Sequence, residues 1–147
     1  MNPNENEVLT KLQAHLGKDL SDSPSPFGAW LNGILRKAEL GVLEIEFTVR
    51  KEMTNSANIM HGGAIAAIMD DTMGMTVASL GHDTFFTTVN LSIDYLSSAK
   101  TGDVVIAKTK INREGRHIVN IECEIVTPEG KLLSKGMSNL FKTSIPK

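Results

Sequence analysis

The chain has 147 residues, a length typical of one domain that is large enough to bury a hydrophobic core. Its formal net charge of −2 argues against a nucleic-acid-binding surface, and Cys123, its one cysteine, excludes an internal disulfide and a cysteine-based metal motif. No apolar run reaches the ~20 residues of a membrane span without interruption by charge. Residues 1–7 are polar and acidic, unlike a signal peptide, so we expect a cytoplasmic protein without membrane or nucleic-acid partners.

The N-terminal part is expected to form a short helix and a loop. Apolar residues recur at helical spacing over residues 8–16, and Gly17 is a plausible end of that helix. Residues 21–26 consist of Ser, Pro and Asp, which predicts a loop. We therefore divide the chain into an N-terminal helix and loop, residues 1–26, and a single domain, residues 27–147.

Strand-like alternation begins soon after this boundary. Leu43 to Val49 alternate between apolar and polar side chains, as a half-buried strand does, and Gly41 is expected to turn an earlier strand into it. Gly115 is expected to take positive φ in a later hairpin turn. The expected strands, in chain order, cover residues 34–40, 43–49, 88–95, 104–111, 119–125 and 132–141.

The stretch from Met60 to Ala78 predicts one long helix. It opens with His-Gly-Gly and continues as Ala, Ile and Met almost without charge. An apolar pattern around the whole circumference of a helix predicts burial on all sides. Asp70 and Asp71 lie in the middle of this pattern, and a carboxylate removed from water is costly unless it is paired or hydrogen-bonded. Catalysis is one explanation for such a residue, and capping of a backbone group is the alternative.

The spacing of two polar residues in this stretch suggests a site shared between chains. Asp70 follows His61 by nine residues, which corresponds to about 900° of rotation and ~13 Å of rise in a helix. The two side chains therefore point to opposite sides of the same helix. If both serve one site, two copies of the chain must build it. His61 is expected at the N-cap, so the angle is approximate.

These elements predict an α+β fold in which an antiparallel sheet curls around one long central helix, with a short N-terminal helix in addition. A single sheet leaves the far side of the central helix bare. A second copy of the chain is therefore expected to cover it.

Two ordered blocks of sequence resemble a known family. Asn55, followed after five residues by His61-Gly62-Gly63 and then by Asp70, is similar to the hotdog-fold acyl-CoA thioesterases of the phenylacetate-degradation (PaaI-like) group. Residues 88–103 resemble the second block of that family, and the resemblance extends over residues 30–142. Asn58 stands where the family usually has glycine, and asparagine tolerates positive φ there.

The resemblance implies hydrolysis of acyl- or aroyl-coenzyme A, without metal or cofactor, by homodimers or by dimers of dimers. Asp70 would attack the carbonyl or activate water, and the Gly62 N–H at the helix start would bind the oxyanion, which suits the positive end of a helix dipole. Asn55 and His61 would come from the same chain as Gly62. Asp70 and Thr88 would come from its partner, with Thr88 positioning the water, although Thr88 also fits an ordinary strand position.

Coenzyme A carries phosphates, which call for cations near the pocket mouth. Turn cations are often merely solvated, and the spacing of the histidines suggests no metal site. The residues expected to flank the nucleotide are Tyr95, Lys100, Arg113, Gly115, Arg116 and His117.

Two other functions stay open at this stage. One is a non-catalytic acyl-CoA-binding regulator on the same fold, and the other is a hotdog dehydratase that acts on acyl carrier protein. The acyl group itself is not indicated by the sequence. Adaptable side chains that could line its pocket are Phe27, Trp30, Met53, Met60 and Met73.

Overall fold

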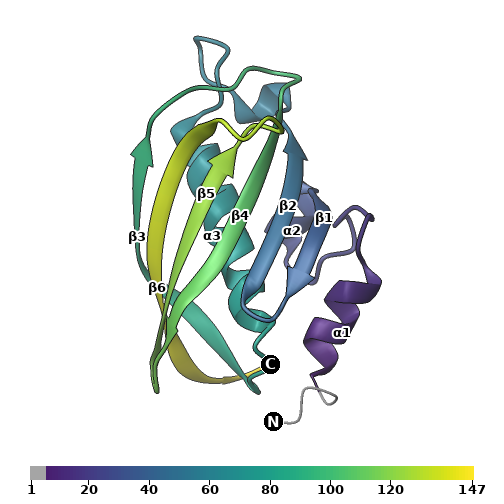
Figure 1. Ribbon diagram of the computed structural model, residues 1–147, viewed down its shortest axis with the longest axis vertical. Helices are drawn as coiled ribbons and strands as arrows, with labels where there is room; N and C mark the ends of the chain where they lie inside the picture. Colours follow the sequence, from purple (N-terminus) through teal and green to yellow (C-terminus); the bar gives the residue numbers. More distant parts are fainter. Residues whose placement is uncertain (1–5) are drawn as a thin grey trace.

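The computed structural model describes residues 6–147, and it shows six antiparallel strands curled around one long helix (Figure 1). The strand order in the sheet is β1-β2-β4-β5-β6-β3, so β1 and β3 form its two edges. The elements are α1 (Glu7–Ala14), α2 (Pro26–Leu31), β1 (Ile34–Glu39), β2 (Val42–Thr48), the short 3₁₀ helix η2 (Lys51–Met53), α3 (Gly62–Ala78), β3 (Thr84–Tyr95), β4 (Val104–Glu114), β5 (Ile118–Val126) and β6 (Leu132–Pro146). The predicted arrangement of sheet and central helix is confirmed.

The central helix α3 begins at a side-chain cap. His61 is the N-cap residue, as predicted, and its Nδ1 accepts a hydrogen bond of 2.8 Å from the Gly63 N–H. The sheet-facing side of α3 is buried through Ile65, Ile68, Met69, Thr72, Met73, Thr76 and Val77. The sheet leaves the other side of α3 bare, as predicted: in the single chain Asp70 is exposed and Asp71 is only partly buried. The predicted cover of this side by a second copy stays a prediction.

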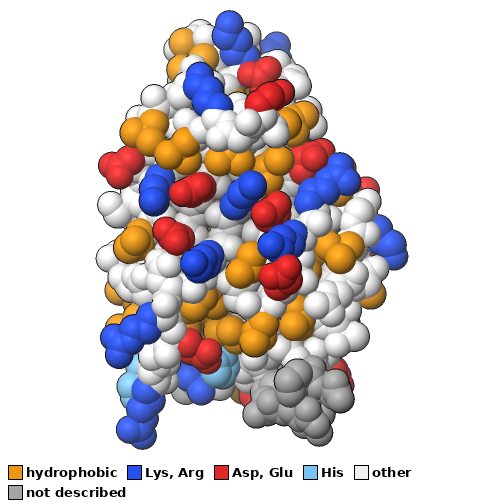
Figure 2. All heavy atoms as spheres, viewed as in Figure 1, with side chains coloured by type: hydrophobic (Ala, Val, Ile, Leu, Met, Phe, Trp, Pro, Cys, Tyr) orange, Lys and Arg blue, Asp and Glu red, His pale blue; other side chains and the backbone are white. Residues whose placement is uncertain are grey.

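The two faces of the sheet differ as expected for an antiparallel sheet with one solvated face. On β5, the side chains of Val119, Ile121, Cys123 and Ile125 are fully buried against α3. On the outer face, Lys and Arg alternate with Asp and Glu across neighbouring strands (Figure 2). Such exposed ion pairs contribute little to stability, and they keep this face polar.

The edge strand β3 is longer and less covered than its sequence suggested. It begins at Thr84 rather than at residue 88, and within residues 6–147 it pairs with β6 alone. The register shifts between Thr88 and Asn90, and this bulge changes which side chains face the helix. Phe85, Val89 and Tyr95 are more than half exposed on this strand, at 53%, 62% and 53%. A long exposed edge with apolar side chains is a template for pairing with another strand.

The N-terminal segment packs against the rest of the domain. The Asn6 side chain caps α1 and donates to the carbonyl oxygen of Ser79 over 2.8 Å, which ties the start of α1 to the end of α3. Helix α1 ends at Ala14, before the predicted stop at Gly17. The apolar cluster that contains Phe27 and Trp30 forms the short helix α2.

Two turns test the predicted backbone conformations. Asn58 has a φ of 59°, as predicted. Gly41 forms the predicted turn between β1 and β2, with a φ of 72°. Positive φ at Gly115 was a wrong prediction. A Cβ atom at Gly115 would lie 2.8 Å from the Ile118 carbonyl oxygen, so glycine is needed there for close approach rather than for its φ.

Candidate active site

Asp70 and Thr88 meet on the open side of α3. The Thr88 hydroxyl on β3 donates to Asp70 Oδ1 over 2.7 Å, and both side chains are exposed in the single chain. The bulge after Thr88 helps to turn this side chain toward α3. The structure thus brings together the two residues that the resemblance assigned to one chain.

A second group of predicted residues surrounds the start of α3. The N–H of Gly62, the first residue of the helix, has no acceptor among the described residues, as is usual in a first helical turn. The Tyr95 hydroxyl donates to the Gly62 carbonyl oxygen over 3.1 Å. Asn55 Oδ1 accepts from the Ala57 N–H over 3.0 Å, so this side chain shapes the loop that leads to His61. The arrangement leaves a backbone donor at the positive end of a helix dipole.

These two groups are separated within one chain. Gly62 and Asp70 lie eight residues apart in α3, a rise of about 12 Å. Thr88 and Tyr95 likewise lie seven residues apart on β3, a span of about 23 Å. One chain alone therefore does not place the Gly62 N–H and the Asp70 carboxylate on the same substrate atom.

The residues predicted to bind the nucleotide are divided between the same two ends of the molecule. Tyr95 and Lys100 lie near the start of α3, where Ile59 and Lys100 form an isolated β-bridge. Arg113, Gly115, Arg116 and His117 belong to the β4–β5 hairpin, at the opposite end of the sheet (Figure 1). The His117 ring stacks on Phe141, with centroids 6.5 Å apart.

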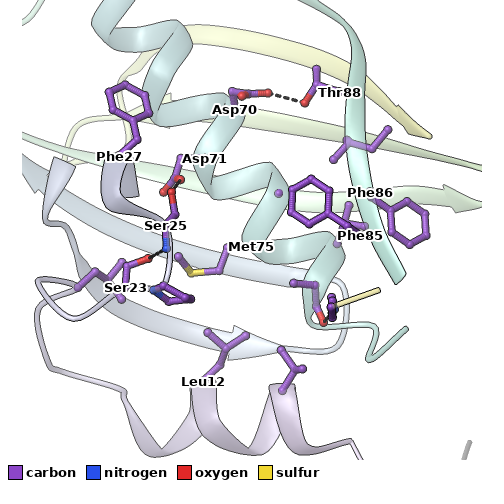
Figure 3. Close-up of a pocket in the computed structure, with 18 of the residues that line it drawn as sticks. Leu12, Ser23, Ser25, Phe27, Asp70, Asp71, Met75, Phe85, Phe86 and Thr88 are labelled. Atoms are coloured by element: carbon purple, nitrogen blue, oxygen red, sulfur yellow. Dashed lines mark hydrogen bonds between the residues drawn. The ribbon is translucent and has the colours of Figure 1, made fainter. Parts of the chain in front are cut away.

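A groove of about 960 Å³ opens beside Asp70 (Figure 3). Its walls come from the N-terminal segment on one side and from the first half of β3 on the other, and α3 forms the floor. Its residues are Val8, Lys11, Leu12, His15, Leu20, Asp22, Ser23, Pro24, Ser25, Phe27, Asp70, Asp71, Gly74, Met75, Val77, Ala78, Phe85, Phe86, Thr87, Thr88, Leu140 and Lys147.

Only one of the five side chains predicted to line an acyl pocket lines this groove, namely Phe27. Met53, Met60 and Met73 are instead buried in the core, at 1%, 5% and 0% exposure. Trp30 stacks on Phe27 and lies beneath the Arg50 guanidinium, which is 4.8 Å from the ring centroid. The prediction was wrong for the three methionines, because spacing alone does not separate core methionines from those that face a groove. It was also wrong for Trp30, which packs against Phe27 and Arg50 outside the groove lining.

Asp71, which the sequence pointed out together with Asp70, also lines the groove, whereas Ser25 and Gly74 were not singled out by the sequence reasoning. Asp71 faces the α2 side, where its Oδ1 accepts a long hydrogen bond of 3.5 Å from the Ser25 hydroxyl. Burial raises the pKa of the Asp71 carboxyl, and the neighbouring charge of Asp70 raises it further. Gly74 is the sequence feature that could have indicated the groove, because an unexplained glycine inside a helix often marks a place where space is needed.

Within residues 6–147, no group of three or more His, Cys, Asp or Glu side chains is placed to hold a metal ion. None of the helices in the same residues has the length and apolarity needed to cross a membrane.

Comparison with known proteins identifies the family. Residues 57–134 match the thioesterase superfamily. Human acyl-coenzyme A thioesterase 13 is 25% identical over 103 residues, which cover 69% of this chain and 74% of that protein. A hypothetical thioesterase protein from Streptococcus pneumoniae, solved with coenzyme A, is 26% identical, with a TM-score of 0.73 and coverage of 79% of this chain and 89% of the other.

The PaaI protein of E. coli, from the phenylacetic acid degradation operon, has the same fold, with a TM-score of 0.81 at 16% identity over 96% of this chain and 97% of that one. The predicted relationship to the hotdog thioesterases of the PaaI-like group is confirmed. The chain belongs to the thioesterase superfamily and is a thioester hydrolase.

Proposed function

We propose that the protein hydrolyses the thioester bond of acyl- or aroyl-coenzyme A, with Asp70 as the reactive carboxylate, at a site built by two chains. The observation that carries this proposal is the 2.7 Å hydrogen bond from Thr88 to Asp70 at the mouth of an apolar groove. The coenzyme A in the pneumococcal relative and the activity named for the human relative support the substrate class.

Pairing of two β3 edges supplies the missing half of the site. Thr88 marks the Asp70 end of the strand, and Tyr95 marks the Gly62 end. In an antiparallel pair of identical strands, a two-fold axis between Leu91 and Ser92 sets Thr88 opposite Tyr95 of a second copy. That register brings the Asp70 carboxylate of one chain toward the Gly62 N–H of the other. It also brings the β4–β5 hairpin of one chain toward the loop around Lys100 of the other.

The chemistry follows from these positions. Asp70 either attacks the thioester carbonyl carbon or removes a proton from a water that attacks it. The Thr88 hydroxyl holds the carboxylate in place, and the Gly62 N–H binds the negative charge that develops on the carbonyl oxygen. The C–S bond then breaks and coenzyme A leaves as a thiolate, a good leaving group. If Asp70 is the nucleophile, water hydrolyses the resulting anhydride and regenerates the carboxylate.

Replacement of Asp70 by Asn tests this proposal. We expect Asp70→Asn to lower kcat by roughly 10²- to 10⁴-fold, because the amide neither attacks nor accepts a proton, while folding and coenzyme A binding persist. Release of free thiol from a panel of coenzyme A thioesters measures the loss. The buried Cys123 thiol should add little background in the folded protein.

Glu129→Gln, an equivalent change on the exposed β5–β6 turn, is the matched control. Full activity in Asp70→Asn would end the proposal. Tight binding of acyl-CoA by the unaltered protein without any hydrolysis would instead favour the regulator.

A further inference from the structure

The wall of the groove opposite Thr88 carries a carboxylate, that of Asp71, which accepts fewer hydrogen bonds than it can. Asp71 directly follows Asp70, so its side chain points about 100° further around α3, toward α2 (Figure 3). Among residues 6–147 its only hydrogen-bond partner is the Ser25 hydroxyl, at 3.5 Å. A carboxylate has about four acceptor positions, so most of them are open toward the groove or to solvent.

Gly28 allows several polar groups to converge at this wall. A Cβ atom at Gly28 would lie 2.9 Å from Asp71 Oδ2 and 3.1 Å from Ser23 Oγ. Any larger residue would push these groups apart. We call Ser23, Ser25 and Asp71 the polar wall of the groove.

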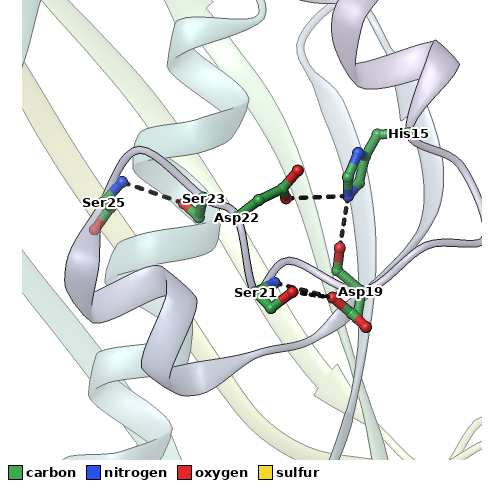
Figure 4. A network of polar contacts seen from close by, with 6 residues as sticks. All are labelled: His15, Asp19, Ser21, Asp22, Ser23 and Ser25. Atoms are coloured by element: carbon green, nitrogen blue, oxygen red, sulfur yellow. Dashed lines mark hydrogen bonds and ion pairs between the residues drawn. The ribbon is translucent and has the colours of Figure 1, made fainter.

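The loop that carries the polar wall is held in place before any ligand binds. The His15 ring contacts the Asp19 carbonyl oxygen through Nε2 at 2.5 Å and lies 3.6 Å from Asp22 Oδ1 (Figure 4). The Ser21 hydroxyl donates to Asp19 Oδ1 over 2.6 Å. A binding group held by its own network loses less entropy when a ligand arrives.

Beyond the polar wall the groove is mostly apolar, although Lys11, His15, Asp22 and Lys147 also line it. Met75, Val77, Phe86 and Leu12 line it, and Gly74 leaves its floor open. An unsubstituted acyl chain in this groove would remove water from Asp71 and return no hydrogen bond, which is unfavourable. A hydroxyl on the chain can donate to the Asp71 carboxylate and accept from Ser25. The raised pKa of Asp71, caused first by burial, agrees with a carboxyl that is short of donors.

On the basis of the thioesterase function proposed above, we propose that Asp71 and Ser25 determine specificity by selecting acyl groups with a hydroxyl near the thioester carbon and an apolar tail beyond it. Since Asp71 is adjacent to Asp70, the hydroxyl must lie within a few bonds of the carbonyl that reacts at Asp70. A 3-hydroxyacyl thioester of coenzyme A meets both conditions. A hydroxyl at the far end of the chain does not.

A matched set of thioesters tests this proposal. We would measure kcat and KM for octanoyl-, 3-hydroxyoctanoyl- and 8-hydroxyoctanoyl-CoA with the unaltered protein, Asp71→Ala, Asp71→Asn and the control Glu129→Gln. We expect the unaltered protein and the control to prefer the 3-hydroxy substrate over octanoyl-CoA by about tenfold or more in kcat/KM, with no preference for the 8-hydroxy substrate. Asp71→Ala should bring the ratio of kcat/KM for 3-hydroxyoctanoyl-CoA to kcat/KM for octanoyl-CoA to within about twofold of one, mainly through KM. Asp71→Asn should keep part of this preference, because the amide oxygen still accepts a hydrogen bond.

Two results would overturn the proposal. One is hydrolysis of octanoyl- and 3-hydroxyoctanoyl-CoA at equal kcat/KM by the unaltered protein. The other is an unchanged ratio in Asp71→Ala or, if that variant does not fold, a fully unchanged ratio in Asp71→Asn together with Ser25→Ala. In both cases the thioesterase function stands and only the selection of a hydroxyl fails. Absence of hydrolysis of every thioester by the unaltered protein would overturn both proposals.

Discussion

The two faces of α3 have similar apolar compositions and different tasks. Toward the sheet, Ile68, Met69 and Met73 are completely buried, and truncation of such side chains typically costs about 2–5 kcal/mol. Toward the groove, Asp70 is exposed and Gly74 has open space around it. The sheet side holds the fold together, whereas the groove side is left for a substrate and a second chain. The difference shows that one side of an apolar helix can serve contacts other than those in the core of its own chain.

The largest effect should follow from breaking the edge that completes the groove side. Val89→Lys places a charge on the exposed β3 edge, where pairing with a second copy would bury it. We expect a monomer by light scattering and a loss of thioesterase activity on the order of 100-fold or more, because the oxyanion donor of the second chain is missing. Leu40→Lys, at a residue that is 60% exposed near the other edge of the sheet, is the control. A fully active Val89→Lys monomer would contradict the shared site.

A smaller and selective effect should follow from filling the groove floor. Gly74→Leu would project a side chain into open space, so we expect kcat/KM to fall about tenfold or more for octanoyl-CoA and to change little for acetyl-CoA. Gly74→Ala distinguishes an effect of filling the groove from an effect on folding stability. It should raise the free energy of unfolding by about 0.5–1 kcal/mol in urea denaturation, since alanine is the better helix former. Equal losses for both substrates would mean that the acyl chain lies elsewhere.

The smallest effect concerns the charge of Asp71 and its pH dependence. The pKa of this carboxyl is raised in the folded chain above its ordinary value of 3.8, so the folded state binds more protons than the unfolded state and loses stability as the pH rises through that range. Asp71→Asn removes this penalty. We expect its denaturation midpoint to exceed that of the unaltered protein at pH 7, and the difference to disappear below pH 3.8, at equal protein concentration. A midpoint below that of the unaltered protein at pH 7 would contradict this.

The order of the main elements could be predicted from the sequence because it follows from local periodicity. A strand was expected over residues 119–125, where Val119, Ile121 and Cys123 form the buried face, and His61 was expected at the N-cap of α3. The bare side of α3 was expected from the presence of a single sheet, but what covers this side was not predictable from periodicity. An apolar pattern does not show whether its cover is the same sheet, a substrate or another chain.

The candidate site was only partly predictable for a related reason. The pairing of Asp70 with Thr88 followed from a resemblance to a family, and the structure brings them within 2.7 Å. The contact between Asp71 and Ser25 joins residues that are 46 positions apart, through a loop whose path depends on tertiary packing. The β3 bulge after Thr88 depends in the same way on strand pairing, which no periodic pattern records.

The most direct test of the central claim is subunit complementation. Asp70→Asn and Gly62→Val should each be inactive, the second because a side chain there would crowd Tyr95 and the substrate carbonyl. If each site takes Gly62 from one chain and Asp70 from the other, an equal, refolded mixture of the two variants contains mixed dimers with one intact site. We expect such a mixture to recover about one quarter of the unaltered activity. No recovery, in a mixture whose mixed dimers are shown to form, would mean that Gly62 and Asp70 do not meet across two chains.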